Sequence, residues 1–155
     1  MKAVPTGTAQ IPLTSRAAGV LLFYQDSVLL AKRCLLFRGH AVPFGGHWSP
    51  FTGAIEEGEN PLVAAVREVK EESGLELDIC DLTYITSIEG QGRSLTLYGN
   101  ELPTLFQPVL DEEHTEYGYF KLTQLHKAPT PIDEDIVRAI ERYVNILRAP
   151  PPIIT

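Results

Sequence analysis

The first clear pattern along the chain is a pair of apolar runs separated by three polar residues. Residues 17 to 24 and 28 to 32 are rich in hydrophobic side chains, and Gln25, Asp26 and Ser27 lie between them. Short apolar runs that flank a polar turn are typical of strands joined in a hairpin. We therefore predict a β-hairpin over this part of the chain.

A pattern with helical spacing covers residues 61 to 73. Asn60 suits the N-cap of such a helix, Pro61 suits its first turn, and Gly74 suits its end. At about 100° per residue, apolar side chains gather on one side of this helix and carboxylates on the other. The apolar side, which we expect to pack in the core, holds Leu62, Val66 and Val69, and the acidic side holds Glu68, Glu71 and Glu72.

Later segments predict further strands. Residues 82 to 89 and 94 to 98 read as a second hairpin around a turn at 90 to 93, and residues 117 to 121 read as a strand. Residues 34 to 48 are interrupted by Gly and Pro, which predicts a long irregular loop.

A second helix is predicted over residues 134 to 147, with Asp133 as its cap and the prolines at 150 to 152 as a barrier to its continuation. Apolar residues recur on one side of it at helical spacing. They are Ile136, Ile140, Tyr143, Val144 and Leu147. Two helices among several strands indicate an α/β fold.

The length and the net charge of the chain limit the classes of ligand and function that we expect. A chain of 155 residues that is 44% hydrophobic is typical of one domain with a sizeable core. We expect a single domain over residues 1 to 155, with a loose leader at 1 to 15 and a proline-rich tail at 149 to 155. A net charge of −7 disfavours long nucleic acid as a ligand, because phosphate backbones are bound chiefly by Lys and Arg. A small phosphorylated ligand stays open, since a metal ion can supply positive charge.

The cellular compartment is predicted from the apolar segments and the cysteines of the sequence. The apolar run at 17 to 23 is too short for a membrane span and has no signal-peptide cleavage pattern. Cys34 and Cys80 lack the spacing of metal ligands, and we expect them to be buried small hydrophobic residues. These features predict a cytoplasmic protein without membrane association.

The acidic side of the first helix needs an explanation. Most charged helix faces are solvated, but they normally pair Glu with Lys or Arg four residues on. Glu68 and Glu72 instead form a like-charged pair at that spacing, which costs roughly a few tenths of a kcal/mol. A bound cation would relieve the repulsion, and carboxylate oxygens without His or Cys favour Mg²⁺, Mn²⁺ or Ca²⁺ over zinc.

The segment from Gly53 to Leu75 resembles the signature box of the Nudix hydrolases, G-x5-E-x7-R-E-U-x-E-E-x-G-U, in which U is aliphatic. Seven fixed identities and two aliphatic positions recur by chance in about one window in 10⁹. All are matched, by Gly53, Glu59, Arg67, Glu68, Val69, Glu71, Glu72, Gly74 and Leu75. The flanks extend the likeness to roughly residues 17 to 145. The resemblance implies a mixed β-sheet sandwiched between α-helices, and metal-dependent hydrolysis of a pyrophosphate bond in a nucleoside diphosphate linked to another group.

The resemblance also implies roles within the box. Glu68, Glu71 and Glu72 would bind Mg²⁺, with Mn²⁺ as an alternative. Glu68 is the favoured acceptor for the proton of the attacking water, although Glu71 or another glutamate is left open. Arg67 would orient a carboxylate, and Gly53 would permit a tight approach of loop and helix next to the substrate. Outside the acidic helix, further expected metal ligands are the carbonyl of Thr52 and the side chain of Glu113.

Candidate substrate-binding residues lie in flanking segments. Arg33 and Arg38 are expected to reach phosphate, whereas Phe44, Trp48 and Tyr119 are candidates for contact with a base. For Trp48 a core position is the stronger alternative.

Nucleoside triphosphates or modified deoxynucleotides rank first as substrates because the chain is short. Dinucleoside polyphosphates, ADP-ribose and nucleotide sugars are alternatives, as is a non-catalytic module that binds nucleotides. A homodimer is left open.

Overall fold

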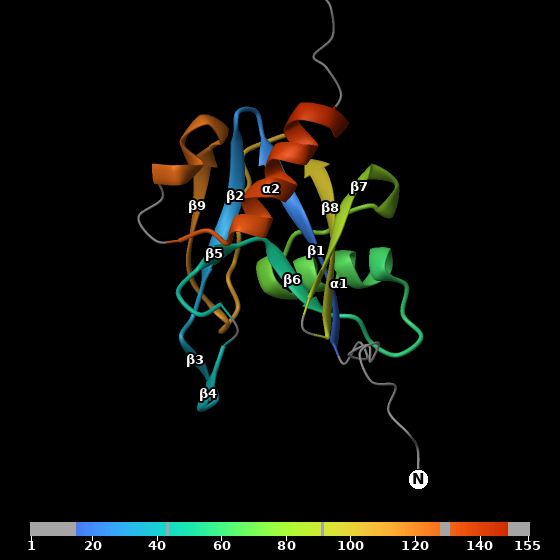
Figure 1. The fold of residues 1–155 in the computed structure, drawn as a ribbon, viewed down its shortest axis with the longest axis vertical. Coiled ribbons are helices and arrows are strands. Elements are labelled where there is room, and N and C mark those ends of the chain that lie inside the picture. Colours follow the sequence, from blue (N-terminus) through green and yellow to red (C-terminus); the bar gives the residue numbers. More distant parts are fainter. Residues whose placement is uncertain (1–14, 43, 91, 128–130, 149–155) are drawn as a thin grey trace, which may run out of the picture.

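A mixed β-sheet lies between two helices (Figure 1). The computed structural model describes residues 15–42, 44–90, 92–127 and 131–148. In the view of Figure 1, α2 crosses in front of the sheet and α1 lies behind it. The predicted fold class is therefore confirmed. The predicted leader, apart from Ser15, and the predicted tail lie outside the described residues.

The central strand is β1 (Ser15–Tyr24), which pairs with three others. The predicted hairpin is confirmed, since β2 (Ser27–Arg33) runs antiparallel to β1 with Leu22 opposite Leu29. Along its other edge β1 pairs in parallel with β8 (Arg93–Glu101). Strand β6 (Phe51–Ala54) pairs antiparallel with residues 17–20 of β1, on the same edge as β2. The sheet order is β5-β2-β1-β8-β7, with β6 on β1 and β9 on β2.

The remaining strands flank this centre. The second predicted hairpin is confirmed, because β7 (Thr83–Gly90) pairs antiparallel with β8. Besides β1, two further strands pair with β2. They are β9 (His114–Lys121), which begins three residues earlier than predicted, and β5 (Trp48–Ser49). The predicted irregular loop also contains a small two-stranded sheet, formed by β3 (Leu36–Phe37) and β4 (His40–Ala41).

Alternation along β1 divides the core into two layers. Val20 and Leu22 point to the layer under α1, whereas Leu21 and Phe23 point to the layer under α2. All four are fully buried. One helix covers each face of the sheet. The acidic residues of α1 therefore lie on the opposite side of the sheet from α2.

Helix α1 (Pro61–Ser73) has the predicted ends. The Asn60 side chain accepts a hydrogen bond from the Leu62 N–H at 2.8 Å, and Gly74 ends the helix with a φ of 83°. The predicted faces were partly wrong. Ala64, Ala65 and Val69 are the buried apolar residues, with Leu62 and Val66 only half-buried, and Glu72 from the acidic side is buried as well.

Helix α2 (Glu134–Arg142) is capped by the Asp133 carboxylate and continues as one π-helical segment, Tyr143–Leu147. The predicted helix thus changes its hydrogen-bond pattern at Tyr143. The Tyr143 ring stacks on Phe23 at 4.3 Å between centroids, and its hydroxyl donates to Glu101 at 2.6 Å. Two short 3₁₀ segments, η1 (Ile79–Asp81) and η2 (Leu122–Lys127), complete the fold.

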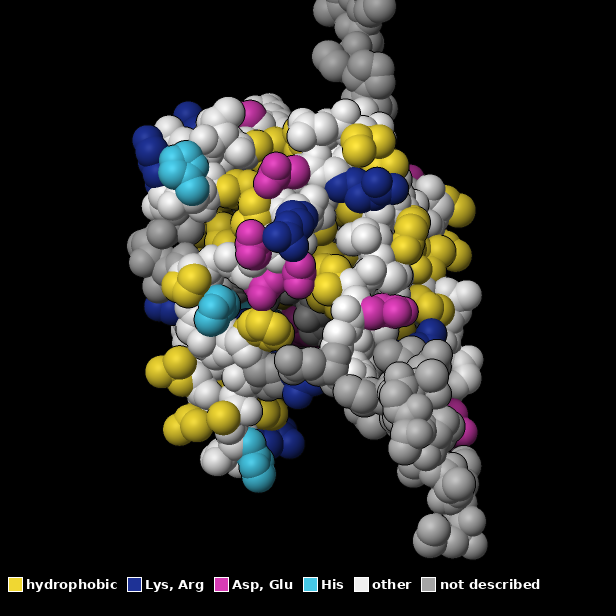
Figure 2. Space-filling view, viewed as in Figure 1, with side chains coloured by type: hydrophobic (Ala, Val, Ile, Leu, Met, Phe, Trp, Pro, Cys, Tyr) yellow, Lys and Arg dark blue, Asp and Glu magenta, His cyan; other side chains and the backbone are white. Residues whose placement is uncertain are grey.

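The surface over α2 mixes charges of both signs (Figure 2). There Arg138 pairs with Glu134 at 3.1 Å and with Asp135 at 3.2 Å. Within the described ranges, no helix is long and apolar enough to cross a membrane. The expectation of two buried cysteines was wrong, because Cys80 is exposed and Cys34 is half-buried; both are free thiols.

Candidate active site

Gly53 and Glu68 bring strand β6 and helix α1 into direct contact. A Cβ built on Gly53 would lie 2.0 Å from Cδ of Glu68 and 2.1 and 2.5 Å from its two carboxylate oxygens. No side chain can occupy that space without moving the carboxylate. Glycine at this position therefore lets the strand pass directly beneath the Glu68 carboxylate.

Arg67 is the centre of the ion pairs at the start of α1. Its Nε and one terminal nitrogen each donate to Glu59 at 2.8 Å, which is the two-pronged geometry that guanidinium and carboxylate groups favour. The guanidinium beside Glu59 lowers the pKa of that carboxyl to about 2, and the Glu56 N–H contributes as well. This pair fixes the loop that precedes the helix.

The same guanidinium reaches two glutamates of the predicted metal site. Its second terminal nitrogen donates to Glu68 at 2.9 Å and to both oxygens of Glu71 at 3.3 Å. A further hydrogen bond runs to the carbonyl of Ala54 at 2.9 Å. Arg67 thus holds Glu68 in place, and hydrogen bonds from Arg67 also fix the exposed Glu71 carboxylate.

Glu72 is buried, although its helical spacing places it on the acidic side of α1. Its side chain is only 3% exposed, and its Oε1 has no hydrogen-bond partner among the described residues. Burial raises the pKa of the Glu72 carboxyl well above its ordinary value, and the neighbouring Glu68 carboxylate raises it further. Asp111 and Glu113 add to the negative potential around it. A positive ion beside Glu68 and Glu72 would offset this repulsion.

The donor set fits a hard divalent cation, although it is not a complete cage. Within the described part of the chain, no three His, Cys, Asp or Glu side chains are arranged to hold a metal ion. Glu68 and Glu72 instead form a neighbouring pair of carboxylates, one of which carries an unpartnered buried oxygen. Mg²⁺ commonly binds through one or two carboxylates and completes its shell with water and substrate phosphates. The pair therefore fits Mg²⁺ or Mn²⁺.

The two other predicted metal ligands lie on different elements. Thr52 is in β6 opposite Gly19, one residue before Gly53. Glu113 precedes β9, where its N–H donates to Asp111 at 3.2 Å and its carbonyl accepts from the Cys34 N–H at 2.8 Å. Glu113 is near enough to raise the pKa of Glu72.

A groove of about 310 Å³ brings together residues that were predicted for different roles. Arg33 and Arg38, the predicted phosphate contacts, share it with Glu113 and with His40. The apolar part of its lining comes from Phe37, Ala41 and Val42. Two cations next to a carboxylate suit an anionic ligand that also carries a metal ion.

The predicted base contacts are less well supported. Trp48 occupies the core position that the sequence favoured for it, so we no longer expect it to contact substrate. The residue is 3% exposed, and its ring packs edge-on against Phe120 at 4.9 Å, in the layer under α2. Tyr119 is half-buried, and its hydroxyl is bound to the backbone of Phe106. Phe44 is exposed, with its ring near His47, so it is the most accessible of these three residues.

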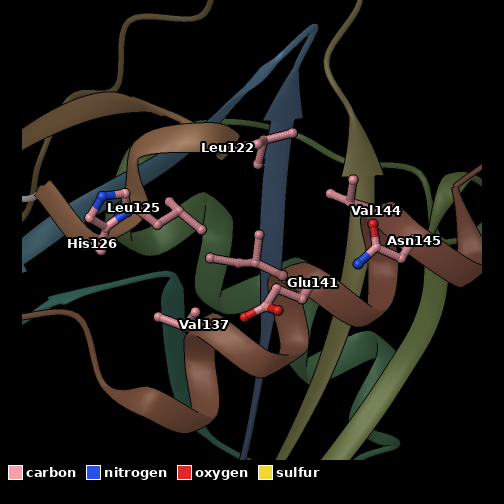
Figure 3. A pocket seen from close by; sticks show the side chains of 8 residues that line it. Leu122, Leu125, His126, Val137, Glu141, Val144 and Asn145 are labelled. Carbon is pink, nitrogen blue, oxygen red and sulfur yellow. The ribbon is translucent and has the colours of Figure 1, made fainter.

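A second hollow, of about 320 Å³, lies between η2 and α2 (Figure 3). It is lined by Leu122, Leu125, His126, Val137, Ile140, Glu141, Val144 and Asn145. None of the predicted site residues lines it. Its position under α2 separates it from the glutamates of α1, which lie on the other side of the sheet.

Sequence reasoning missed the partners that fix the site. Glu59 was recognised in the motif but received no role, and Asp111 and His114 received none, although both lie beside Glu72 in the fold. The signal for Glu59 was present, because its eight-residue spacing from Arg67 is part of the motif. For Asp111 and His114, spacing alone gave no signal, since their contact with α1 is long-range.

Comparison with known proteins identifies the family. A model of the NUDIX domain matches residues 13–145, and the chain therefore belongs to the Nudix family. A mouse bis(5′-nucleosyl)-tetraphosphatase (asymmetrical) is 34% identical over 82 residues, 53% of this chain and 52% of the mouse protein. An 8-oxo-dGTP diphosphatase of Proteus vulgaris is 33% identical over 81 residues, 52% of this chain and 68% of that enzyme. The chain thus spans about half the length of the mouse relative.

A solved structure shows the same fold. The MutT NUDIX hydrolase of Burkholderia pseudomallei superposes with a TM-score of 0.68 at 22% identity, and the match covers 83% of this chain and 96% of that one. This likeness shows that the two chains share a fold.

Proposed function

We propose that this protein hydrolyses a pyrophosphate bond in a nucleoside diphosphate linked to another group, with Mg²⁺ or Mn²⁺ as cofactor. The observation that carries the proposal is the pair formed by Glu68 and the buried Glu72, whose Oε1 lacks a partner among the described residues. A bound cation would stabilise two carboxylates that are crowded in this way. Membership of the Nudix family supports the same reaction.

Each residue of the site has a distinct task in this proposal. When bound, the cation would neutralise phosphate charge and lower the pKa of the attacking water. Glu68, held by Arg67 at 2.9 Å, would accept the proton of that water. Arg33 and Arg38 would bind phosphate oxygens in the groove that they share with Glu113. Glu71, which pairs with Arg67, would support the orientation of the guanidinium.

For the substrate, we rank nucleoside triphosphates and modified deoxynucleotides first. The matched part of the Proteus vulgaris diphosphatase supports this class. Dinucleoside polyphosphates rank second. The mouse tetraphosphatase supports this class, as does the stretch Glu113-His114-x-x-Tyr117, which resembles an element that also occurs in dinucleoside polyphosphate hydrolases. Phe44, exposed beside the loop that contributes Arg38, is the ring that we propose for contact with a base.

A panel of nucleotides tests both the reaction and the ranking. Release of nucleoside monophosphate, phosphate or pyrophosphate is measured with Mg²⁺ and with EDTA, using triphosphates, dinucleoside polyphosphates, ADP-ribose and nucleotide sugars. We expect triphosphates to give the highest kcat/KM. A tenfold lead for another class, about 1.4 kcal/mol, refutes the ranking but not the reaction. Binding of nucleotides without any release would instead indicate a non-catalytic module.

A further inference from the structure

Two buried polar atoms face each other between α1 and β9. Oε1 of Glu72 lies 3.7 Å from Nε2 of His114, and their side chains are 3% and 0% exposed. Among the described residues, neither atom has a hydrogen-bond partner. Buried polar side chains are usually hydrogen-bonded, so an unpartnered pair of this kind calls for an explanation.

The other ring nitrogen of His114 is fixed. Its Nδ1 lies 2.7 Å from Oδ1 of Asp111, and the same oxygen accepts the Glu113 N–H at 3.2 Å. An ionised carboxylate can only accept, so Nδ1 is the donor in this pair. With Nδ1 held in this way, the ring has one orientation, and Nε2 faces Glu72.

Packing prevents the ring from moving away. The Phe51 ring, which is 1% exposed, contacts His114 edge-on at 5.4 Å between centroids. Phe51 comes from β6, the strand that also contains Gly53. The imidazole therefore fills the space beside the Glu72 carboxylate between two elements that are both anchored in the sheet.

From these contacts we propose that His114 is a positioning residue for Glu72. It keeps the Glu72 carboxylate directed at Glu68, and Asp111 keeps His114 in the orientation that does so. The inference rests on the proposed function in one respect, namely that the Glu68–Glu72 pair binds a divalent cation. Replacing a residue that orients a metal-binding carboxylate commonly lowers metal affinity by about 10-fold to 100-fold.

Mn²⁺ binding without nucleotide tests the proposal, measured by the loss of the free-ion signal in electron paramagnetic resonance. His114→Leu should weaken Mn²⁺ binding at least about tenfold, whereas His114→Gln, which keeps a polar atom near Nε2, should stay within about threefold of wild type. His126→Leu, an exposed histidine on the α2 side, is the matched control and should leave binding unchanged. In hydrolysis assays, His114→Leu should raise the Mg²⁺ concentration for half-maximal rate more than it raises the KM for nucleotide.

A second variant keeps the test decisive if His114→Leu fails to fold. Asp111→Ala removes the partner of Nδ1 at a side chain that is 27% exposed, and it should also weaken Mn²⁺ binding. Unchanged Mn²⁺ affinity in folded His114→Leu or Asp111→Ala protein overturns the positioning role, as does a wild-type protein that binds no Mn²⁺. Weakened Mn²⁺ binding in a protein that hydrolyses no nucleotide leaves the positioning role in place and removes the proposed function.

Discussion

Gly53 lies so close to Glu68 that a Cβ on the glycine would fall 2.0 Å from the carboxylate carbon. The Glu68 carboxylate is in turn fixed by Arg67 at 2.9 Å. The first glycine of the motif and its central glutamate therefore form one structural unit. Any side chain at position 53 must displace the group that we propose as the proton acceptor.

Gly53→Ala should therefore impair catalysis more than folding. The displaced atoms belong to the end of a side chain, which can move, so we expect a stable protein whose kcat falls at least about tenfold, since small misplacements of catalytic groups are costly. The control is Gly90→Ala, because a Cβ there meets no atom within 4 Å. Steady-state kinetics and thermal melting of both variants check this, and wild-type turnover in Gly53→Ala would contradict the role of the close contact.

Glu59→Gln should destabilise the protein in a pH-dependent manner. Because Arg67 lowers the pKa of Glu59 from 4.5 to about 2 in the folded protein, the ionised carboxylate stabilises the fold above pH 4.5. That contribution is lost as the pH falls through about 2. The difference in the free energy of unfolding between wild type and Glu59→Gln should therefore be largest at pH 7 and shrink between pH 4.5 and pH 2.

Urea unfolding at pH 7, 5, 4 and 3 measures this difference. The exposed Glu57, two residues earlier, provides the control variant Glu57→Gln. A difference for Glu59→Gln that is the same at every pH would show that the ion pair with Arg67 does not stabilise the fold.

Gly99→Ala should destabilise the layer under α2. A Cβ on Gly99 would lie 2.5 Å from the Tyr143 ring, which is stacked on Phe23 and anchored to Glu101. Because the ring has little room to yield, we expect a loss of about 1 to 3 kcal/mol in the free energy of unfolding. Gly90→Ala again serves as the control. If both variants unfold at the same urea concentration, Tyr143 packs more loosely against β8 in solution than in this structure.

Helix α1 shows what local sequence can predict. Its ends were predicted to the residue because Asn60, Pro61 and Gly74 are each within a residue or two of the backbone groups they satisfy. The β1–β2 hairpin was predictable for the same reason. The signals for these elements do not depend on the rest of the fold.

Glu72 shows where that reasoning stops. A helical projection placed Glu72 with Glu68 and Glu71 on one solvated or metal-binding side, but β9 and the loop before it cover this part of the helix. The covering residues, Asp111 and His114, are about forty positions away in the chain. Burial here is a property of tertiary packing, and helical periodicity carries no information about it.

For Trp48 the sequence favoured a core position but did not show how the ring reaches it. The residue lies in a segment that was predicted to be an irregular loop, yet it begins a short strand that pairs with β2, and its ring enters the core. Arg33, Arg38 and Glu113 were named separately from the sequence, and the fold places them around one groove. Chain order alone could not show that the three residues line the same surface.

The proposed reaction depends most directly on Glu72, so its test is the Mg²⁺ dependence of hydrolysis in wild type and in Glu72→Gln. The amide has nearly the same shape as the carboxyl that it replaces, and we expect the metal-free variant to melt no lower than wild type. With the best nucleotide of the panel, turnover at saturating Mg²⁺ should fall at least roughly 100-fold. A variant that keeps wild-type turnover at saturating Mg²⁺ would contradict the assignment of the Glu68–Glu72 pair as the metal site.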